Sequence, residues 1–413
     1  MNNNIPQGYK DSPLGIIPQE WEVKRLGEVG NISSGGTPLR DKKEYWNGDI
    51  PWITTSLINL PTIDFADEYI TEIGLNESSA KMLKADTILM AMYGQGHTRG
   101  KVSILKIPAA TNQACAAISP INQATKYIYY CLDAKYQTIR DLSNDGGQKN
   151  LSLGIIKNIQ IPLPPLPEQQ RIAEVLGTWD VAIEKQGALV DKLTERKRAL
   201  MQQLLTAKKR LPNFSEPWET VRLGEVAKRV TRKNGENNQN VMTISAQKGF
   251  ICQTDFFNKS IASETLSVYF LVQQNEFCYN KSYSNGYPMG ATKRLKNCDK
   301  AVVTTLYICF SIIEEVCNLD FIEQYFESGA LNKGLTKVAN EGGRAHGLLN
   351  VTPTDFFNVA VQLPTLPEQT AIAQILTTAD REIEGAKAKL ESLRTQKRGL
   401  MQQLLSGKKR IKI

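Results

Sequence analysis

The chain has 413 residues, more than one ordinary hydrophobic core organises, which predicts two or more domains. Its net charge of +8 suits a polyanionic partner, although such a small excess is weak evidence by itself. Seven cysteines without a C-x-x-C spacing argue against a disulfide framework or zinc ribbon and indicate reduced, mostly buried thiols. No apolar run approaches the roughly 20 residues of a membrane span, and the first residues do not read as a signal peptide, so we expect a cytoplasmic protein.

Residues 1–162 are predicted to form a first globule of mixed α/β structure. Residues 86–93 are an apolar, β-branched run typical of a strand, and residues 126–139 are a helical candidate. Glycines at 35–36 and at 94 and 96 indicate turns.

Residues 163–210 begin LPPLPEQ, end MQQLLTAKKR and are predicted to be a long helix. Pro167 suits the first helical turn, and Glu168 beside it favours the positive helix terminus. The basic residues 208–210 favour the opposite end. Apolar residues recur at a spacing of three and four, as in a heptad seam. They are Ile172, Leu176, Trp179, Ile183, Val190, Leu193, Leu200 and Leu204.

Residues 211–362 are predicted to form a second mixed α/β globule. Residues 301–308 resemble a strand, Asn285 and Gly286 mark a turn, and residues 321–328 are a helical candidate.

Residues 363–413 repeat the long helix. The segment 363–410 begins LPTLPEQ, ends MQQLLSGKKR and is identical to 163–210 at 26 of 48 positions. The matching stripe predicts that the two helices pair with each other rather than only covering a globule. Polar residues interrupt the seam at Gln186, Lys197 and Lys397, which costs stability but can fix register. The second seam comprises Ile372, Leu376, Ala379, Ile383, Leu390, Leu393, Leu400 and Leu404.

A fainter repeat precedes each globule interior. Residues 21–29, WEVKRLGEV, return at 218–226 as WETVRLGEV. Between the repeats, residues 30–160 and 227–360 show no convincing alignment. The repeated segments therefore form a common frame, and the two dissimilar regions are different inserts within it.

This order of segments resembles the specificity subunits of type I restriction–modification systems, over essentially the whole chain. In the first globule the motifs SGGTP (34–38), YWNGDIPWI (45–53), GQGHTRGKV (94–102) and GGQKNLS (146–152) resemble one class of target-recognition domain. In the second, YNKSYSNGYPMGATKRL (279–295), TTLYICF (304–310) and residues 343–350 resemble another.

The resemblance implies an α+β fold. Two target-recognition domains, 1–162 and 211–362, are joined by helices 163–210 and 363–413, which pair as an antiparallel coiled coil with pseudo-two-fold symmetry. Each domain reads one half of a split, asymmetric DNA site, and the helices set the unread gap. The partners are double-stranded DNA, two adenine-methyltransferase subunits and motor-nuclease subunits. S-adenosylmethionine, ATP and Mg²⁺ are expected on those subunits, with no cofactor or metal in this chain.

Candidate DNA-binding residues combine charge, aromatic rings and flexible glycine turns. Arginine can pair with guanine, whereas lysine usually meets phosphate, and a solvated loop position is the plain alternative for each residue. Gln148, Lys149 and Arg344 are weaker candidates. The main candidates are Tyr93, Gln95, His97, Arg99, Lys101, Lys281, Tyr283, Lys293 and Arg294.

Catalytic constellations are missing from the sequence. It has neither a nucleotide-binding P-loop nor the N-P-P-[YF] motif of adenine methyltransferases. Its two histidines, His97 and His346, fall in different globules, which argues against a histidine metal site or triad. A non-catalytic specificity subunit is therefore predicted. The alternatives are a solitary specificity protein that redirects another system's methyltransferase, a self-contained DNA-modifying enzyme, and a protein-only coiled-coil adaptor.

Overall fold

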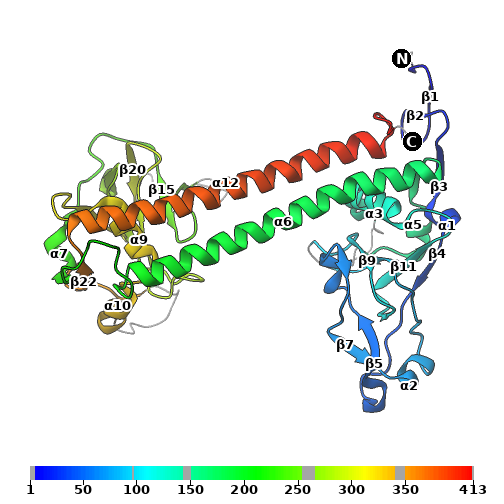
Figure 1. The fold of residues 1–413 in the computed structure, drawn as a ribbon, viewed down its shortest axis with the longest axis horizontal. Helices are drawn as coiled ribbons and strands as arrows, with labels where there is room; N and C mark the ends of the chain where they lie inside the picture. The colour runs from blue at the N-terminus through cyan, green and yellow to red at the C-terminus, as the bar shows by residue number, and fades with distance from the viewer. Residues whose placement is uncertain (1–4, 95–96, 143–149, 254–265, 340–348, 412–413) are drawn as a thin grey trace. The chain divides into compact units, whose positions relative to one another are not determined.

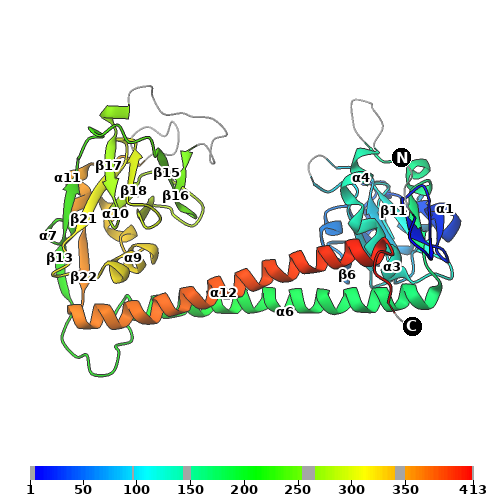
Figure 2. The ribbon, with the colours of Figure 1, turned by 90° about the horizontal axis from the view of Figure 1, so that it is seen from above.

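The chain folds into two compact units, each built from one globule and from halves of two long helices (Figure 1). The computed structural model describes residues 5–94, 97–142, 150–253, 266–339 and 349–411. The first unit comprises residues 1–186 with 389–413, and the second comprises residues 187–388. Helix α6 (Leu166–Leu204) and helix α12 (Leu366–Leu405) each enter both units. Within each unit the two helix halves run antiparallel (Figure 2).

The first globule is built around a five-stranded sheet in the order β4-β11-β8-β9-β6. A three-stranded sheet, β10-β5-β7, and two-stranded ribbons, β1-β2 and β12-β3, complete it. The elements are β1 (Tyr9–Lys10), β2 (Ile17–Pro18), β3 (Glu22–Arg25), α1 (Leu26–Val29), β4 (Gly30–Ser34), β5 (Trp46–Ile53), β6 (Thr62–Ile63), β7 (Glu68–Ile70), α2 (Glu72–Asn76), β8 (Ile88–Ala91), β9 (Val102–Leu105), β10 (Ala110–Thr111), β11 (Cys115–Pro120), α3 (Thr125–Ala134), α4 (Tyr136–Asp141), α5 (Leu153–Lys157) and β12 (Gln160–Leu163).

The second globule is built around a four-stranded antiparallel sheet in the order β14-β21-β18-β19, with the ribbons β13-β22, β15-β16 and β17-β20. Its elements are β13 (Glu219–Arg222), α7 (Leu223–Val226), β14 (Ala227–Val230), β15 (Met242–Ser245), β16 (Gly249–Cys252), β17 (Phe270–Gln273), β18 (Phe277–Asn280), β19 (Ala291–Arg294), β20 (Lys300–Val303), β21 (Ile308–Ile312), α9 (Leu319–Glu327), α10 (Asn332–Val338), α11 (Pro353–Phe357) and β22 (Ala360–Leu363).

The two globules share a central topology that their sequences conceal. Strands β4-β11-β8-β9 and β14-β21-β18-β19 have the same order, and every neighbouring pair in both sets is antiparallel. In each globule the last strand of this set along the chain is followed by a helix, α3 or α9, and then by a strand that leads into a long helix. The inserts therefore differ in sequence and accessory strands, but not in this central sheet.

The fainter sequence repeat forms the entry to each globule. A short helix, α1 or α7, has the same sequence, LGEV, in both units. The backbone amides of Leu26 and Leu223 donate to the carbonyls of Ile159 and Val359, each at 2.9 Å. Glycine follows each leucine because α5 and α11 approach closely: a Cβ on Gly27 or Gly224 would lie 3.3 Å from the nearest side-chain atom of Lys157 or Phe357.

The globule cores extend onto the long helices. Ile172 and Leu176 of α6 and Leu404 of α12 belong to the buried core of the first globule, together with Trp21 and Tyr127. The second globule buries Leu204 of α6 and Ile372, Ala373 and Leu376 of α12 in the same way. The helix ends are thus part of each globule, which fixes them more firmly than seam packing alone would.

Two predicted elements are each divided in the structure. Residues 301–308 were expected as one strand, but they span β20, a turn closed by Tyr307 N donating to Thr304 O at 3.3 Å, and the first residue of β21. The helical candidate 126–139 lies across α3 and α4, which are separated at Lys135. At this break, the ammonium of Lys135 donates to the carbonyl oxygen of Gln160 in β12 at 2.7 Å.

Candidate nucleic-acid interface

The glutamate of each LPEQ motif is fully buried and bound to the far end of the opposite long helix. Glu168 is 0% exposed, and its two carboxylate oxygens accept from Arg410 Nε at 2.6 Å and Nη2 at 2.9 Å. Glu368 is 1% exposed and accepts from Arg210 Nε and Nη2, both at 2.7 Å. These hydrogen bonds raise the pKa of both arginines. Each glutamate therefore closes an antiparallel helix pair, a role beyond the predicted helix-terminus electrostatics.

The glutamine that follows binds the globule. Gln169 Oε1 accepts from the Ala124 amide at 3.1 Å, and its Nε2 donates to Pro164 O at 2.8 Å. Gln369 repeats this pattern, accepting from the Asn318 amide at 2.8 Å and donating to Pro364 O at 2.9 Å. The repeated Glu-Gln pair therefore joins three pieces of chain in each unit: both helices and the loop before α3 or α9.

The tryptophan of the fainter repeat differs between the units. Trp21 is fully buried, and its Nε1 donates to Glu168 at 3.0 Å. The equivalent Trp218 Nε1 is buried without a hydrogen-bond partner among the described residues.

The residues of the predicted heptad seam are buried to different degrees. Seven of the thirteen residues chosen for helix pairing are buried, and the other six are partly buried. The buried residues lie mainly near the helix ends, under the globules, and the partly buried ones mainly toward the middle. The buried residues are Ile172, Leu176, Leu204, Ile372, Leu376, Ile383 and Leu404; the partly buried ones are Trp179, Ile183, Leu193, Leu200, Leu393 and Leu400.

The seam lysines form ion pairs across the helices. Lys197 Nζ lies 2.6 Å from Asp380 Oδ1 in the second unit, and Lys397 Nζ lies 2.5 Å from Asp180 Oδ1 in the first. The lysine side chains are 16% and 14% exposed. The two predicted lysine interruptions are therefore charged contacts, and they occur at equivalent places in the two units.

The first candidate reading loop lies against α4. Tyr93 and His97 are exposed, Arg99 and Lys101 are partly buried, and Gln95 lies outside the described residues. Tyr136 Oη donates to the His97 carbonyl oxygen at 2.6 Å and accepts from Arg140 Nη1 at 2.9 Å. Gly100 has a φ of +84°, and a Cβ there would lie 3.2 Å from Arg140 Cγ.

Arg140 is a basic residue of this surface that sequence reasoning missed. The available signal was its position just beyond the helical candidate 126–139.

Lys101 Nζ donates to Asn59 Oδ1 at 2.8 Å, so this hydrogen bond holds the lysine side chain in place before any DNA is bound.

The second group of candidates divides into exposed and paired residues. Tyr283 is 64% exposed, and Lys281 is partly buried. Lys293 is 9% exposed; its ammonium forms an ion pair with Glu327 and donates to Tyr287 Oη at 3.2 Å.

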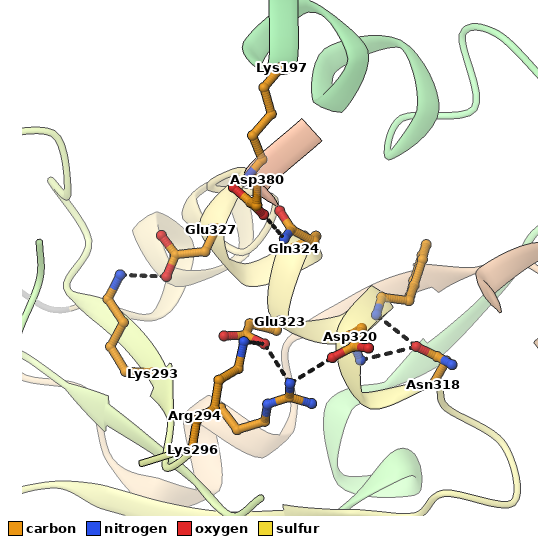
Figure 3. Close-up of polar contacts among 11 residues, drawn as sticks. Lys197, Lys293, Arg294, Lys296, Asn318, Asp320, Glu323, Gln324, Glu327 and Asp380 are labelled. Atoms are coloured by element: carbon orange, nitrogen blue, oxygen red, sulfur yellow. Dashed lines mark hydrogen bonds and ion pairs between the residues drawn. The ribbon is translucent and has the colours of Figure 1, made fainter. Parts of the chain in front are cut away.

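Arg294 is also turned toward carboxylates, as Figure 3 shows. Its Nη2 lies 2.6 Å from Asp320 Oδ1 and 3.1 Å from Glu323 Oε2, and its side chain is 9% exposed. The surface position expected for Lys293 and Arg294 is therefore wrong: both connect β19 to α9. Gln148, Lys149 and Arg344 lie outside the described residues.

Among the described residues, no group of three or more His, Cys, Asp or Glu side chains is arranged to hold a metal ion. Nor is any described helix both long and apolar enough to cross a bilayer.

The fold and contacts define a class of protein in which one helix frame, present twice, carries two different globules. A family model described as "Type I restriction modification DNA specificity domain" matches residues 18–192 and 215–394. The chain therefore belongs to the family of type I restriction–modification DNA specificity domains, and it carries two copies of that domain.

Relatives support the assignment over different spans. The chain is 34% identical over 194 residues to the MjaIX specificity subunit of Methanocaldococcus jannaschii, covering 45% of this chain and 44% of that one. It is 35% identical over 179 residues to the EcoR124I/EcoR124II specificity subunit of Escherichia coli, covering 42% and 44%. These two matches span less than half of those relatives. The MjaVIII specificity subunit of M. jannaschii matches at 23% identity over 438 residues, 99% of this chain and 98% of that one.

Solved structures show the same fold. The S subunit of a type I restriction–modification system from M. genitalium aligns with a TM-score of 0.57 at 14% identity, covering 98% of this chain and 97% of that one. A chain from a study of assembly and conformational transition in the type I system aligns with the same TM-score at 16% identity, covering 95% and 99%.

Proposed function

We propose that each globule reads one half of a split, asymmetric DNA sequence, and that the helix frame holds two adenine-methyltransferase subunits. The duplication of the frame around two unlike globules carries this proposal. Equal frames offer equivalent attachment to two copies of one partner, while unlike globules offer two different reading surfaces. A DNA duplex has a two-fold symmetric backbone, which suits two readers mounted in the same way.

Motor-nuclease subunits would join this core to complete the restriction enzyme. S-adenosylmethionine, ATP and Mg²⁺ would bind to those partners, because the sequence of this chain contains neither a P-loop nor a methyltransferase motif. The role of the chain would be to choose the DNA sequence and to hold the partners on it.

Base reading in the first globule is assigned to Tyr93, His97, Arg99 and Lys101. The exposed Tyr93 and His97 lie beside Arg99 and Lys101, with Arg140 on the neighbouring helix. Arginine can pair bidentately with guanine, and lysine can hold a phosphate. In the second globule the assignment is restricted to Lys281 and Tyr283, because Lys293 and Arg294 are paired with carboxylates.

A methylome tests the proposal. The chain would be expressed in a methylation-free host together with the methyltransferase encoded by a neighbouring gene. Modified adenines would then be mapped by single-molecule sequencing. A split motif with adenines on opposite strands, lost when this chain is omitted, is the expected result. Methylation without this chain contradicts the proposal, as does methylation by the purified chain alone.

A further inference from the structure

One carboxylate in each unit binds both long helices to the globule. In the first unit this residue is Asp180 of α6. Its Oδ1 lies 2.5 Å from Lys397 Nζ of α12, and its Oδ2 accepts from Tyr130 Oη of α3 at 2.5 Å. We call Asp180, Lys397 and Tyr130 the first junction.

The second unit repeats the arrangement on the other helix. Asp380 of α12 accepts through Oδ1 from Lys197 Nζ of α6 at 2.6 Å, and through Oδ2 from Gln324 Nε2 of α9 at 2.7 Å. Figure 3 shows the Asp380 carboxylate between the Lys197 ammonium and the Gln324 amide. We call Asp380, Lys197 and Gln324 the second junction.

Each junction couples two movements that are otherwise independent: the sliding of one helix along the other, and the rotation of the globule on the helix pair. One carboxylate oxygen binds the opposite helix, so sliding the helices past each other breaks a charged hydrogen bond. The other oxygen binds the globule, so rotating the globule on the helix pair breaks a second one. Hydrogen bonds to charged groups are stronger than neutral ones and strongly directional, and polar seam residues are known to fix register.

The globule donors differ although their helix partners are the same. Burial, and then the hydrogen bond to Asp180, raise the pKa of Tyr130, so its hydroxyl stays a proton donor. Lys397 Nζ also lies 5.1 Å from the centre of the Tyr130 ring. In the second unit Gln324 supplies an amide, and its Oε1 is buried without a partner among the described residues. The second junction also borders a hollow of ≈ 490 Å³.

We propose that Asp180 and Asp380 are positioning residues for sequence recognition. Each holds its own globule at one orientation on the helix pair and thereby limits the site to one length of unread gap. Neither residue reads a base. The inference rests on the proposed function, because a gap exists only if the two globules read separate half-sites.

The test is a methylome of junction variants in the complex with the methyltransferase. Asp180→Ala and Asp380→Ala remove both arms of a junction, whereas Tyr130→Phe and Gln324→Met remove only the globule arm. We expect the same bases in both half-sites, but a wider distribution of gap lengths. The share of methylated sites whose gap differs by one base pair should rise about tenfold, the ratio that loss of one charged hydrogen bond allows.

Glu382→Gln is the matched control. Glu382 forms an exposed ion pair with Arg196 across the same helices without joining the globule contact, so its loss should leave the gap unchanged. The double variant Asp180→Lys with Lys397→Asp restores the interhelix pair in reverse but not the carboxylate that accepts from Tyr130, so the gap distribution should stay as wide as in Tyr130→Phe.

Three outcomes overturn the inference. Weaker methylation at a single, unchanged gap would show that the junctions only stabilise the fold. Altered bases in one half-site would make them part of the reading surface. A split motif that is absent even with the unaltered chain overturns the proposed function itself and is recognisable before any variant is made. If the alanine variants fail to fold, Tyr130→Phe and Gln324→Met carry the same test.

Discussion

At the scale of single residues, the two most buried charged side chains among the described residues, Glu168 and Glu368, lie at the starts of the long helices. Glu168 has no solvent exposure and is bound by the Arg410 guanidinium and the Trp21 indole. A buried charge that loses its partner is costly, whereas an exposed ion pair contributes little. Arg410, which binds the buried Glu168, should therefore contribute much more to the free energy of unfolding than Arg171, which forms an exposed ion pair with Glu174.

We expect Arg410→Ala to lower the local unfolding free energy of the first unit by about 1–3 kcal/mol, the usual cost of leaving a buried polar group without its partner. Arg171→Ala, which removes an exposed Arg171–Glu174 pair, should cost less than about 0.5 kcal/mol. Native-state hydrogen exchange over the first turns of α6 measures both. Equal effects of the two variants would show that Glu168 is solvated when Arg410 is absent.

In the second globule, Tyr283 should act in DNA reading, whereas Lys293 and Arg294 should act in stability. Tyr283 is 64% exposed, so Tyr283→Ala should weaken recognition of one half-site without changing the melting temperature. Lys293→Ala with Arg294→Ala should lower the melting temperature, because Asp320 and Glu327 would lose their cations and Glu323 would keep only Lys296. Any loss of half-site recognition in this double variant would follow from the displaced α9. Thermal denaturation alongside methylation of purified DNA distinguishes the cases, and unchanged stability of the double variant would contradict the structural role.

At the scale of elements, sequence patterns predicted the helices well and the sheets poorly. The long helices were predictable because a seam held over many turns and a near-identical copy are both visible in one sequence. The common strand order of the globules was not, because a buried strand such as β8 or β18 is only a short apolar run, whose neighbours are set by distant chain. The loop 93–101 was visible through its glycines, but its support by Tyr136 and Arg140 depends on tertiary contacts.

Charge in the sequence alone does not separate reading residues from structural ones. Lys293 and Arg294 resemble a DNA-binding pair in sequence, yet their partners lie 26 or more residues away on α9. The same holds for Glu168 and Arg410, whose separation of 242 residues hides their pairing. Only the repeat gave a hint, since the glutamate and the arginine are both duplicated in it.

Glycines inside the long helices provide a test of the helix frame. A Cβ at Gly187 or Gly385 would meet no atom within 4 Å, so alanine fits at both positions. Each substitution should stabilise its helix by about 0.5–1 kcal/mol, the usual difference between glycine and alanine in a helix interior. Chemical denaturation of the single variants and the double variant measures this. A loss of stability would indicate that the helices depart from regular geometry at these glycines.

At the scale of the whole molecule, the two helices are the only described elements that enter both units. If they set the gap between half-sites, lengthening both together should lengthen the gap, whereas lengthening one alone should break the pairing. The register of the Lys197–Asp380 pair gives the matched positions: Lys192 precedes Lys197 by five residues, and Gly385 follows Asp380 by five. One heptad inserted after each keeps the seam in phase.

Seven residues add about 10 Å of helix, which corresponds to about three base pairs of duplex. The methylome of the double insertion should therefore show both half-sites unchanged and a gap about three base pairs longer. Four residues inserted after Lys192 alone move every later seam position of α6 against α12, so that variant should lose methyltransferase docking or methylation. If the double insertion leaves the gap unchanged, the length of the helices does not set the distance between the half-sites. The junctions at Asp180 and Asp380 would then have to act on each globule without a fixed spacer between them.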